Sequence, residues 1–109
     1  MPDISAAEAL RLAQGGTRLV DVREADEWMR GHSPLASHLP MSQLQSRVAE
    51  LPDDEQLLIV CHSGGRSQRV TEALNGAGYD AVNVAGGMLA WSVAGGELVA
   101  DGAQAPSVD

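Results

Sequence analysis

The chain has 109 residues, of which 44% are hydrophobic and only 3% aromatic, so a single domain with an aliphatic core is expected. The formal net charge of −8 at pH 7 leaves no basic face for nucleic acid, and no apolar stretch is long enough to cross a membrane. The one cysteine cannot form an internal disulfide, which favours a reducing compartment, and we expect a cytoplasmic protein.

Apolar periodicity and turn residues divide the chain into alternating helices and strands. In the first half we expect a very short strand at Ile4, a helix capped by Ser5 that stops at Gly15-Gly16, a strand over 18–23 and a short acidic helix over 24–30. A loop with at most a short extended piece follows over 32–40, and a capping box at Ser42 then opens a helix that reaches Leu51. In the second half we expect a strand over 57–60, a helix from Ser67 to Gly76, a strand over 81–84 and a short helix over 88–94. This alternation predicts a parallel sheet covered on both faces, with ligands at the carboxyl ends of its strands.

The segment from Leu57 to Val70 carries the strongest chemical signal. Its first four residues are aliphatic and predict a strand buried on both faces, and Cys61 stands at the end of this strand. Gly64 and Gly65 have no Cβ, so their backbone N–H groups can turn inward and form a nest for negative charge. Ser67 can cap the next helix, whose N-terminus adds a positive dipole end.

This loop favours an anion at the sulfur of Cys61. The thiolate is the nucleophilic form of cysteine, and nearby cations and helix amides lower its pKa. Arg66 adds a fixed charge and a fork of donors suited to an oxyanion. A lone cysteine at the end of an apolar strand is more often an inert buried side chain, but such a cysteine does not need a Gly-Gly-Arg-Ser loop. We therefore interpret Cys61 as a nucleophile. Asp21 and Arg23, at the end of another expected strand, are predicted to converge with it.

Four segments, in this order, resemble the single-domain rhodaneses. They are Leu19-Val20-Asp21-Val22-Arg23 with Glu24 and Trp28, then Gly31-His32-Ser33-Pro34, then Cys61-His62-Ser63-Gly64-Gly65-Arg66-Ser67, and finally Gly86-Gly87-Met88-Leu89-Ala90-Trp91. The resemblance runs from Ile4 to Gly96. It implies a rhodanese-like α/β sandwich with a five-stranded parallel sheet and helices on both faces. We expect one such domain over residues 1–100 and a flexible tail over 101–109.

The resemblance also implies a sulfurtransferase that uses no metal or other cofactor. The Cys61 thiolate takes the outer sulfur of thiosulfate or another small anionic donor, and a thiol, cyanide or a protein acceptor then removes it from the persulfide. Arg66 orients the oxyanion of the donor, and Ser67 can donate a hydrogen bond to the sulfur, cap the helix, or do both. The implied substrate loop is His62, Ser63, Gly64, Gly65, Arg66 and Ser67. The implied supporting residues are Asp21, Arg23 and His32.

The second of these segments departs from the family. Ser33, Leu35, Ser37 and His38 stand where Ile, Gly, Ile and Asn are usual, which leaves the path of the 32–40 loop open.

Two alternatives remain at this point. Cysteine phosphatases and arsenate reductases have a related loop with five residues between Cys and Arg, whereas four residues separate Cys61 from Arg66 here. The shorter loop suits a sulfur atom better than a tetrahedral phosphate. The other alternative is a persulfide carrier or docking module that passes sulfur to a partner protein, and it requires the same thiolate as an enzyme.

Overall fold

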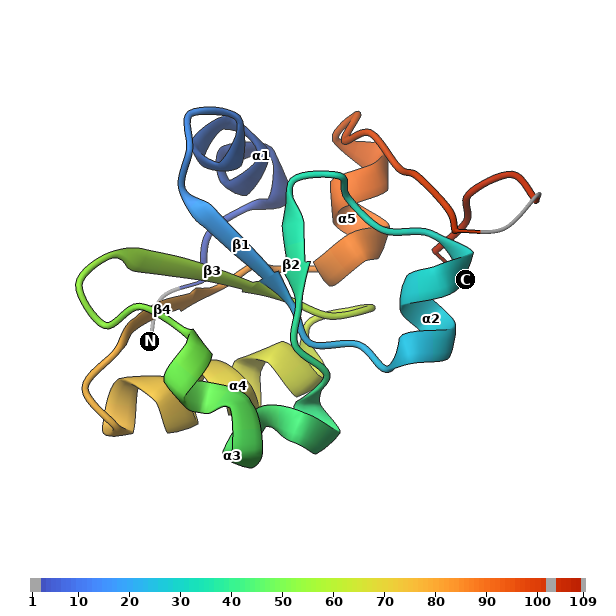
Figure 1. Ribbon diagram of the computed structural model, residues 1–109. Coiled ribbons are helices and arrows are strands. Elements are labelled where there is room, and N and C mark those ends of the chain that lie inside the picture. Colours follow the sequence, from blue (N-terminus) through green and yellow to red (C-terminus); the bar gives the residue numbers. More distant parts are fainter. Residues whose placement is uncertain (1–2, 102–103, 109) are drawn as a thin grey trace.

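The computed structural model describes residues 3–101 and 104–108 of the chain. Its centre is a parallel four-stranded sheet with the strand order β2-β1-β3-β4 (Figure 1). The strands are β1 (Arg18–Asp21), β2 (Ala36–His38), β3 (Gln56–Val60) and β4 (Asp80–Asn83). Strand β3 lies between two others, and its aliphatic run from Leu57 to Val60 is buried, as predicted for a strand covered on both faces.

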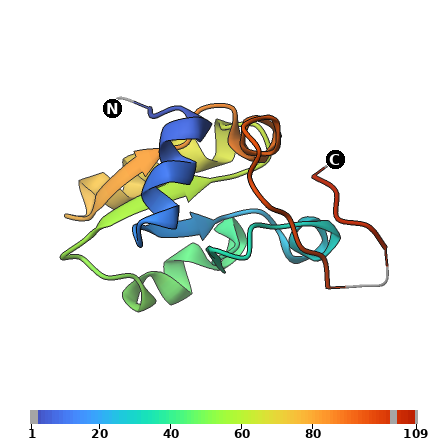
Figure 2. The ribbon, with the colours of Figure 1, turned by 90° about the horizontal axis from the view of Figure 1, so that it is seen from above.

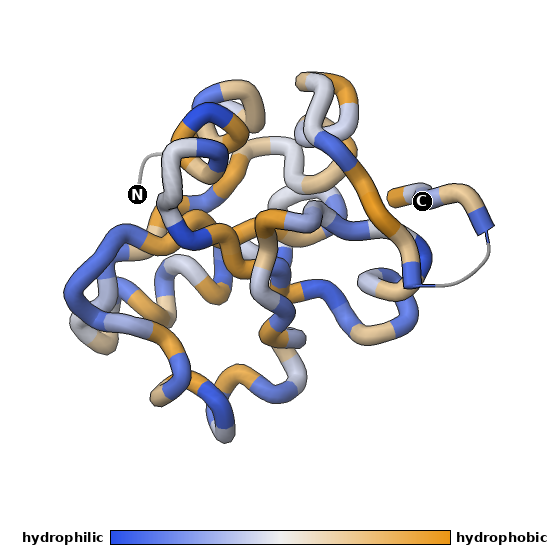
Figure 3. The backbone as a smooth tube through the Cα atoms, turned by 45° about the horizontal axis from the view of Figure 1, so that its top comes forward, coloured by the Kyte–Doolittle hydropathy of each residue, from blue (hydrophilic) through white to orange (hydrophobic). Residues whose placement is uncertain are grey.

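Helices cover both faces of this sheet. They are α1 (Ala6–Gln14), α2 (Ala25–Arg30), α3 (Leu44–Arg47), α4 (Gly65–Gly76) and α5 (Gly87–Val93), with 3-10 turns at Met41–Gln43 and Val48–Glu50. The core on one face joins the strands to α1 and α5, and the core on the other joins them to α4 and the α3 region (Figures 1 and 2). The apolar stretches of the strands therefore lie inside, between the helices (Figure 3). No helix in the described part of the chain is long and apolar enough to span a membrane.

The predicted sheet of five strands is wrong by one strand. Ile4 makes a single parallel bridge to Val84, with its N–H 3.0 Å from the carbonyl oxygen of Asn83 and its own carbonyl 2.8 Å from the N–H of Ala85. Ser5 is the N-cap of α1, as predicted, so the helix begins directly after this bridge. The pairing therefore cannot continue beyond Ile4 into the helix, and the expected first strand is reduced to a one-residue bridge.

Two serines that were predicted to cap helices have other roles. Helix α4 begins before Ser67, and its N-cap is Gly64 at φ 114° and ψ −13°. Ser67 therefore lies inside the first turn. Ser42 donates its hydroxyl to the carboxylate of Glu24 at 2.7 Å, and the helix predicted after it is broken into 3-10, α and 3-10 turns. In both places the serine side chain forms a tertiary hydrogen bond and does not cap the helix that the local pattern predicted.

The segment after α5 returns to α2. Val99 and His32 form an antiparallel bridge, and the N–H of Ser107 donates to the carbonyl of Arg30 at 2.9 Å. Val108 is buried against the core on the α1 and α5 side. The flexibility expected for residues 101–109 stays a prediction, because one structure does not report motion. Residues 102, 103 and 109 of this segment lie outside the described part.

Gly87, the first residue of α5, tests how tightly this helix packs on the strand ends. Its φ is 59°, and a Cβ there would lie 2.4 Å from the carbonyl oxygen of Cys61 and 2.5 Å from that of His62. We expect Gly87→Ala to lower the free energy of unfolding by about 2–4 kcal/mol, measured by urea denaturation. The matched control is Gly76→Ala at the end of α4, where a Cβ meets nothing within 4 Å and stability should not fall. Equal losses in the two variants would contradict the close approach.

Candidate active site

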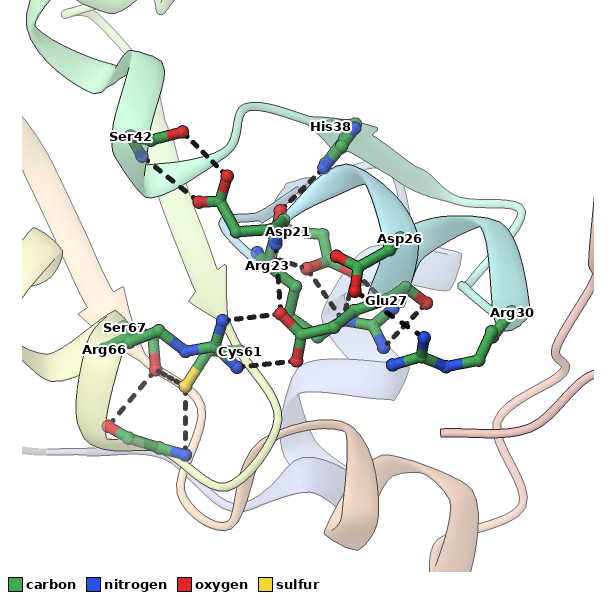
Figure 4. Close-up of polar contacts among 12 residues, drawn as sticks. Asp21, Arg23, Asp26, Glu27, Arg30, His38, Ser42, Cys61, Arg66 and Ser67 are labelled. Atoms are coloured by element: carbon green, nitrogen blue, oxygen red, sulfur yellow. Dashed lines mark hydrogen bonds and ion pairs between the residues drawn. The ribbon is translucent and has the colours of Figure 1, made fainter. Parts of the chain in front are cut away.

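Cys61 follows β3 directly and begins the loop that leads into α4 (Figure 4). Its side chain is buried, with 1% of the residue exposed. The N–H of Gly64 donates to Sγ at 3.1 Å, and the hydroxyl of Ser67 lies 3.3 Å from the same atom. The one cysteine of the chain is therefore held by donors from its own loop and from the first turn of α4.

The carbonyl groups of Cys61 and His62 accept hydrogen bonds from the first turn of α5. The N–H of Met88 donates to the carbonyl of Cys61 at 2.7 Å, and the N–H of Leu89 donates to that of His62 at 3.2 Å. Gly64 has the positive φ that few side chains tolerate, and this turn brings its N–H back towards the sulfur. The first turn of α5 thus donates hydrogen bonds to the carbonyl oxygens of the loop, and the amides of the loop are free to face Sγ.

These contacts decide the acidity of the thiol. Burial raises the pKa of Cys61, but hydrogen bonds from the Ser67 hydroxyl and from the amides of Ser67, Gly64 and Ser63 outweigh it, and the pKa lies below its ordinary value. The thiolate, which is the reactive form, is therefore a larger fraction of Cys61 at neutral pH than for an ordinary cysteine.

Ser67 also touches a residue that sequence reasoning missed. Its hydroxyl lies within hydrogen-bond distance of the side-chain oxygen of Asn83 and 3.3 Å from the carbonyl of Gly64. A hydroxyl has one proton, so these acceptors compete with the sulfur, and a charged sulfur is the strongest acceptor of the three. Asn83 is buried at the end of β4, and a polar residue inside the aliphatic run 81–84 was the signal that could have found it.

Arg66 does not point to an open oxyanion site in this structure. Its two terminal nitrogens pair with the two carboxylate oxygens of Glu27, at 2.6 and 2.8 Å (Figure 4). These hydrogen bonds lower the pKa of Glu27 to about 2. Sequence reasoning missed Glu27, although it lies three residues after Glu24, the spacing of a capping box. Its carboxylate accepts a hydrogen bond from the N–H of Glu24 at 3.1 Å.

Asp21 and Arg23 form an ion pair that is fully buried, with 2.8 Å between Nη2 and Oδ2. Asp21 pairs with Val60 in the register of β1 and β3, so it lies on the strand next to the one that ends at Cys61. The same Nη2 of Arg23 donates to the carbonyl of Gly31 at 2.7 Å. The pair therefore fastens the end of α2 to β1, beside the cysteine loop.

The remaining predicted residues lie at different distances from the sulfur. His32 is buried against α2, where its ring stacks on Trp28 with 3.6 Å between centroids and its Nδ1 lies 2.8 Å from the Trp28 carbonyl. Its contacts are thus with α2 and with Val99 rather than with the cysteine loop. His62 is half-buried, and its Nδ1 has no hydrogen-bond partner within the described residues. Ser63 and Gly65 are exposed at the loop surface.

Three comparisons place this geometry among known proteins. The family model for the rhodanese-like domain matches residues 5–94. A sulfurtransferase of Allochromatium vinosum is 40% identical over 83 residues, which are 75% of this chain and 78% of that protein. The Bacillus subtilis protein named "Putative sulfur carrier protein YrkF" is 35% identical over 75 residues, 68% of this chain and 40% of its own length.

A solved structure extends the similarity to three dimensions. The rhodanese-related protein from Thermoplasma volcanium superposes with a TM-score of 0.83 at 29% identity, covering 91% of this chain and 98% of that one. This confirms the α/β fold expected from the sequence, apart from the number of strands.

The hydroxyl of Ser67 can be tested through the acidity of Cys61. We expect Ser67→Ala to raise the midpoint of thiolate formation by about one pH unit, because the variant loses a hydrogen bond to the charged sulfur. Ultraviolet absorbance of the thiolate reports on Cys61 alone, since the chain has one cysteine, once the titration of Cys61→Ala is subtracted.

Ser63→Ala is the control, because Ser63 is exposed and contributes only its backbone amide, which alanine keeps. Equal midpoints for Ser67→Ala and the unmodified protein would show that the hydroxyl does not lower the pKa of Cys61.

Proposed function

Since the chain belongs to the rhodanese-like domain family, we propose that it is a sulfurtransferase that moves sulfane sulfur from thiosulfate or a similar donor to a thiophilic acceptor. The observation that carries this proposal is the pair of donors held on Cys61 Sγ, the amide of Gly64 and the hydroxyl of Ser67. They stabilise negative charge on the sulfur before the reaction and whenever the sulfur is released again.

The reaction has two halves, joined by a persulfide on Cys61. In the first half, the thiolate forms a bond to the outer sulfur of the donor, the S–S bond of the donor breaks, and sulfite leaves with that electron pair. In the second half, an acceptor thiolate or cyanide bonds to the outer sulfur, and the Cys61 thiolate leaves with the electron pair. The chain has no second cysteine, so the acceptor comes from outside.

The other candidate residues act around this centre in our proposal. His62, Ser63, Gly64 and Gly65 form the wall of the donor site through their backbone. The Asp21–Arg23 pair supports the wall by fixing α2, and His32 supports it through Trp28 on the same helix. Because 1% of Cys61 is exposed, a donor reaches the sulfur only when neighbouring groups move aside.

This burial also favours a second candidate function, a persulfide carrier that discharges only to a partner protein. YrkF, named as a sulfur carrier, is one of the relatives of this chain. A carrier and an enzyme share the first half of the reaction and differ in the second. A buried persulfide is protected from small acceptors and is released when a partner opens the loop.

The test of the proposed function is turnover of thiosulfate and cyanide, together with mass spectrometry of the intact protein. We expect the protein to gain one sulfur atom after incubation with thiosulfate and to form thiocyanate when cyanide is added. Cys61→Ala should lose both properties, because the nucleophile is absent.

The same measurements separate the alternatives. A sulfur adduct that small acceptors discharge slowly identifies a carrier. Turnover by Cys61→Ala, or hydrolysis of a phosphate ester by a protein that gains no sulfur, would overturn the proposal.

A further inference from the structure

The contact between Glu27 and Arg66 bears on the choice of sulfur donor, a choice that exists only if the chain transfers sulfur as proposed above. Glu27 is fixed from two sides, by the N–H of Glu24 at 3.1 Å and by the guanidinium of Arg66 at 2.6 and 2.8 Å. Its side chain is 17% exposed, against 35% for Arg66. Since the pKa of Glu27 is about 2, the carboxylate is charged at any physiological pH.

The pair occupies the donors that an anionic substrate would use. Both terminal nitrogens of Arg66 bind Glu27 in the planar, two-point arrangement that also suits an oxyanion. A sulfonate group that reaches this guanidinium must displace a carboxylate tethered to α2, or bind beside it. In both cases the carboxylate of Glu27 stays near the bound donor, and its repulsion of the donor grows with the negative charge of the donor.

The two ion pairs carry no net charge, because Arg23 balances Asp21 and Arg66 balances Glu27. Arg66 lies close enough to Cys61 for the charge of the thiolate to raise its pKa further, after the larger effect of its hydrogen bonds to Glu27. Among these five groups the thiolate is the charge left unbalanced, and the net charge of the chain, −8, adds to the repulsion of anions.

We propose that Glu27 is a specificity-determining residue, which disfavours dianionic donors such as thiosulfate and selects donors of lower charge, organic persulfides above all. With a persulfide R–S–SH, the Cys61 thiolate bonds to the terminal sulfur, the S–S bond of the donor breaks, and RS⁻ leaves with that electron pair. The proton stays on the transferred sulfur. This step needs no guanidinium, because the leaving group carries no oxyanion.

Glu27→Gln isolates the charge of this residue. Glutamine keeps an oxygen that can accept the N–H of Glu24, so the first turn of α2 is retained, while the competition for Arg66 is weakened. The matched control is Asp26→Asn, the neighbouring residue on α2, which removes the same charge from an exposed side chain facing Arg30 at 3.7 Å.

The first measurement compares kcat/KM for thiosulfate with kcat/KM for an arylthiosulfonate, a monoanion, with cyanide as the common acceptor. We expect the ratio of the two values to rise about tenfold in Glu27→Gln and to stay unchanged in Asp26→Asn. The ratio is used because a freed Arg66 also changes the thiolate fraction, which affects both donors equally. An unchanged ratio in Glu27→Gln, or an equal rise in Asp26→Asn, overturns the inference.

The second measurement needs no turnover. Thiosulfate binding is followed by calorimetry on Cys61→Ser, which cannot react, and on Cys61→Ser combined with Glu27→Gln or with Asp26→Asn. We expect the Kd to fall about tenfold with Glu27→Gln and to stay the same with Asp26→Asn. Equal affinities overturn the role of Glu27 even if the protein transfers sulfur. Tighter binding in a protein that forms no persulfide with any donor overturns the proposed function alone.

Discussion

The orientation of the peptide groups between Cys61 and Gly64 is the constraint on which the site depends. A peptide group presents its N–H and its C=O on opposite sides, so a loop that turns amides towards a sulfur must find partners for its oxygens elsewhere. The first amides of α5 supply those partners by binding the carbonyls of Cys61 and His62. This requires α5 to begin very close to the loop, and Gly87 allows that approach. A helix far from the cysteine in sequence thus decides which way its loop faces.

Neutral donors, rather than free cations, stabilise the thiolate in this protein. Arg66 lies close enough to feel the charge of the Cys61 thiolate, yet it is bound by Glu27, and Arg23 is bound by Asp21. What remains for the sulfur is a set of backbone amides and a hydroxyl, which act over short distances and are little affected by the negative charge of the whole chain. An acidic protein can therefore lower the pKa of a cysteine through neutral hydrogen-bond donors.

Helix α2 connects these groups although none of its residues is buried. Arg23 holds its end, Glu27 binds the cysteine loop, and Trp28 stacks between His32 and His38, with centroid distances of 3.6 and 4.5 Å. Polar and stacking contacts thus take the place of a hydrophobic anchor.

Local pattern was enough to identify the buried strand that ends at Cys61, the alternation of helices and strands, and the anion-favouring loop. These features depend on the period of apolar residues and on glycines, which act over a few neighbours. The count of strands was wrong because Ile4 is followed directly by Ser5, the N-cap of α1, a matter of where a helix begins rather than of propensity.

The partners of the site residues were decided by the tertiary structure. Arg66 and Glu27 are 39 residues apart, and Ser67 meets Asn83 from a different element. The strength of a charge pair or a hydrogen bond depends on distance and direction in space, and a one-dimensional pattern contains neither for residues this far apart. The sequence by itself therefore determined that the one cysteine stands at a strand end. The packing of α2, α4 and α5 around that end determined which groups face it, and how much charge they leave for a substrate.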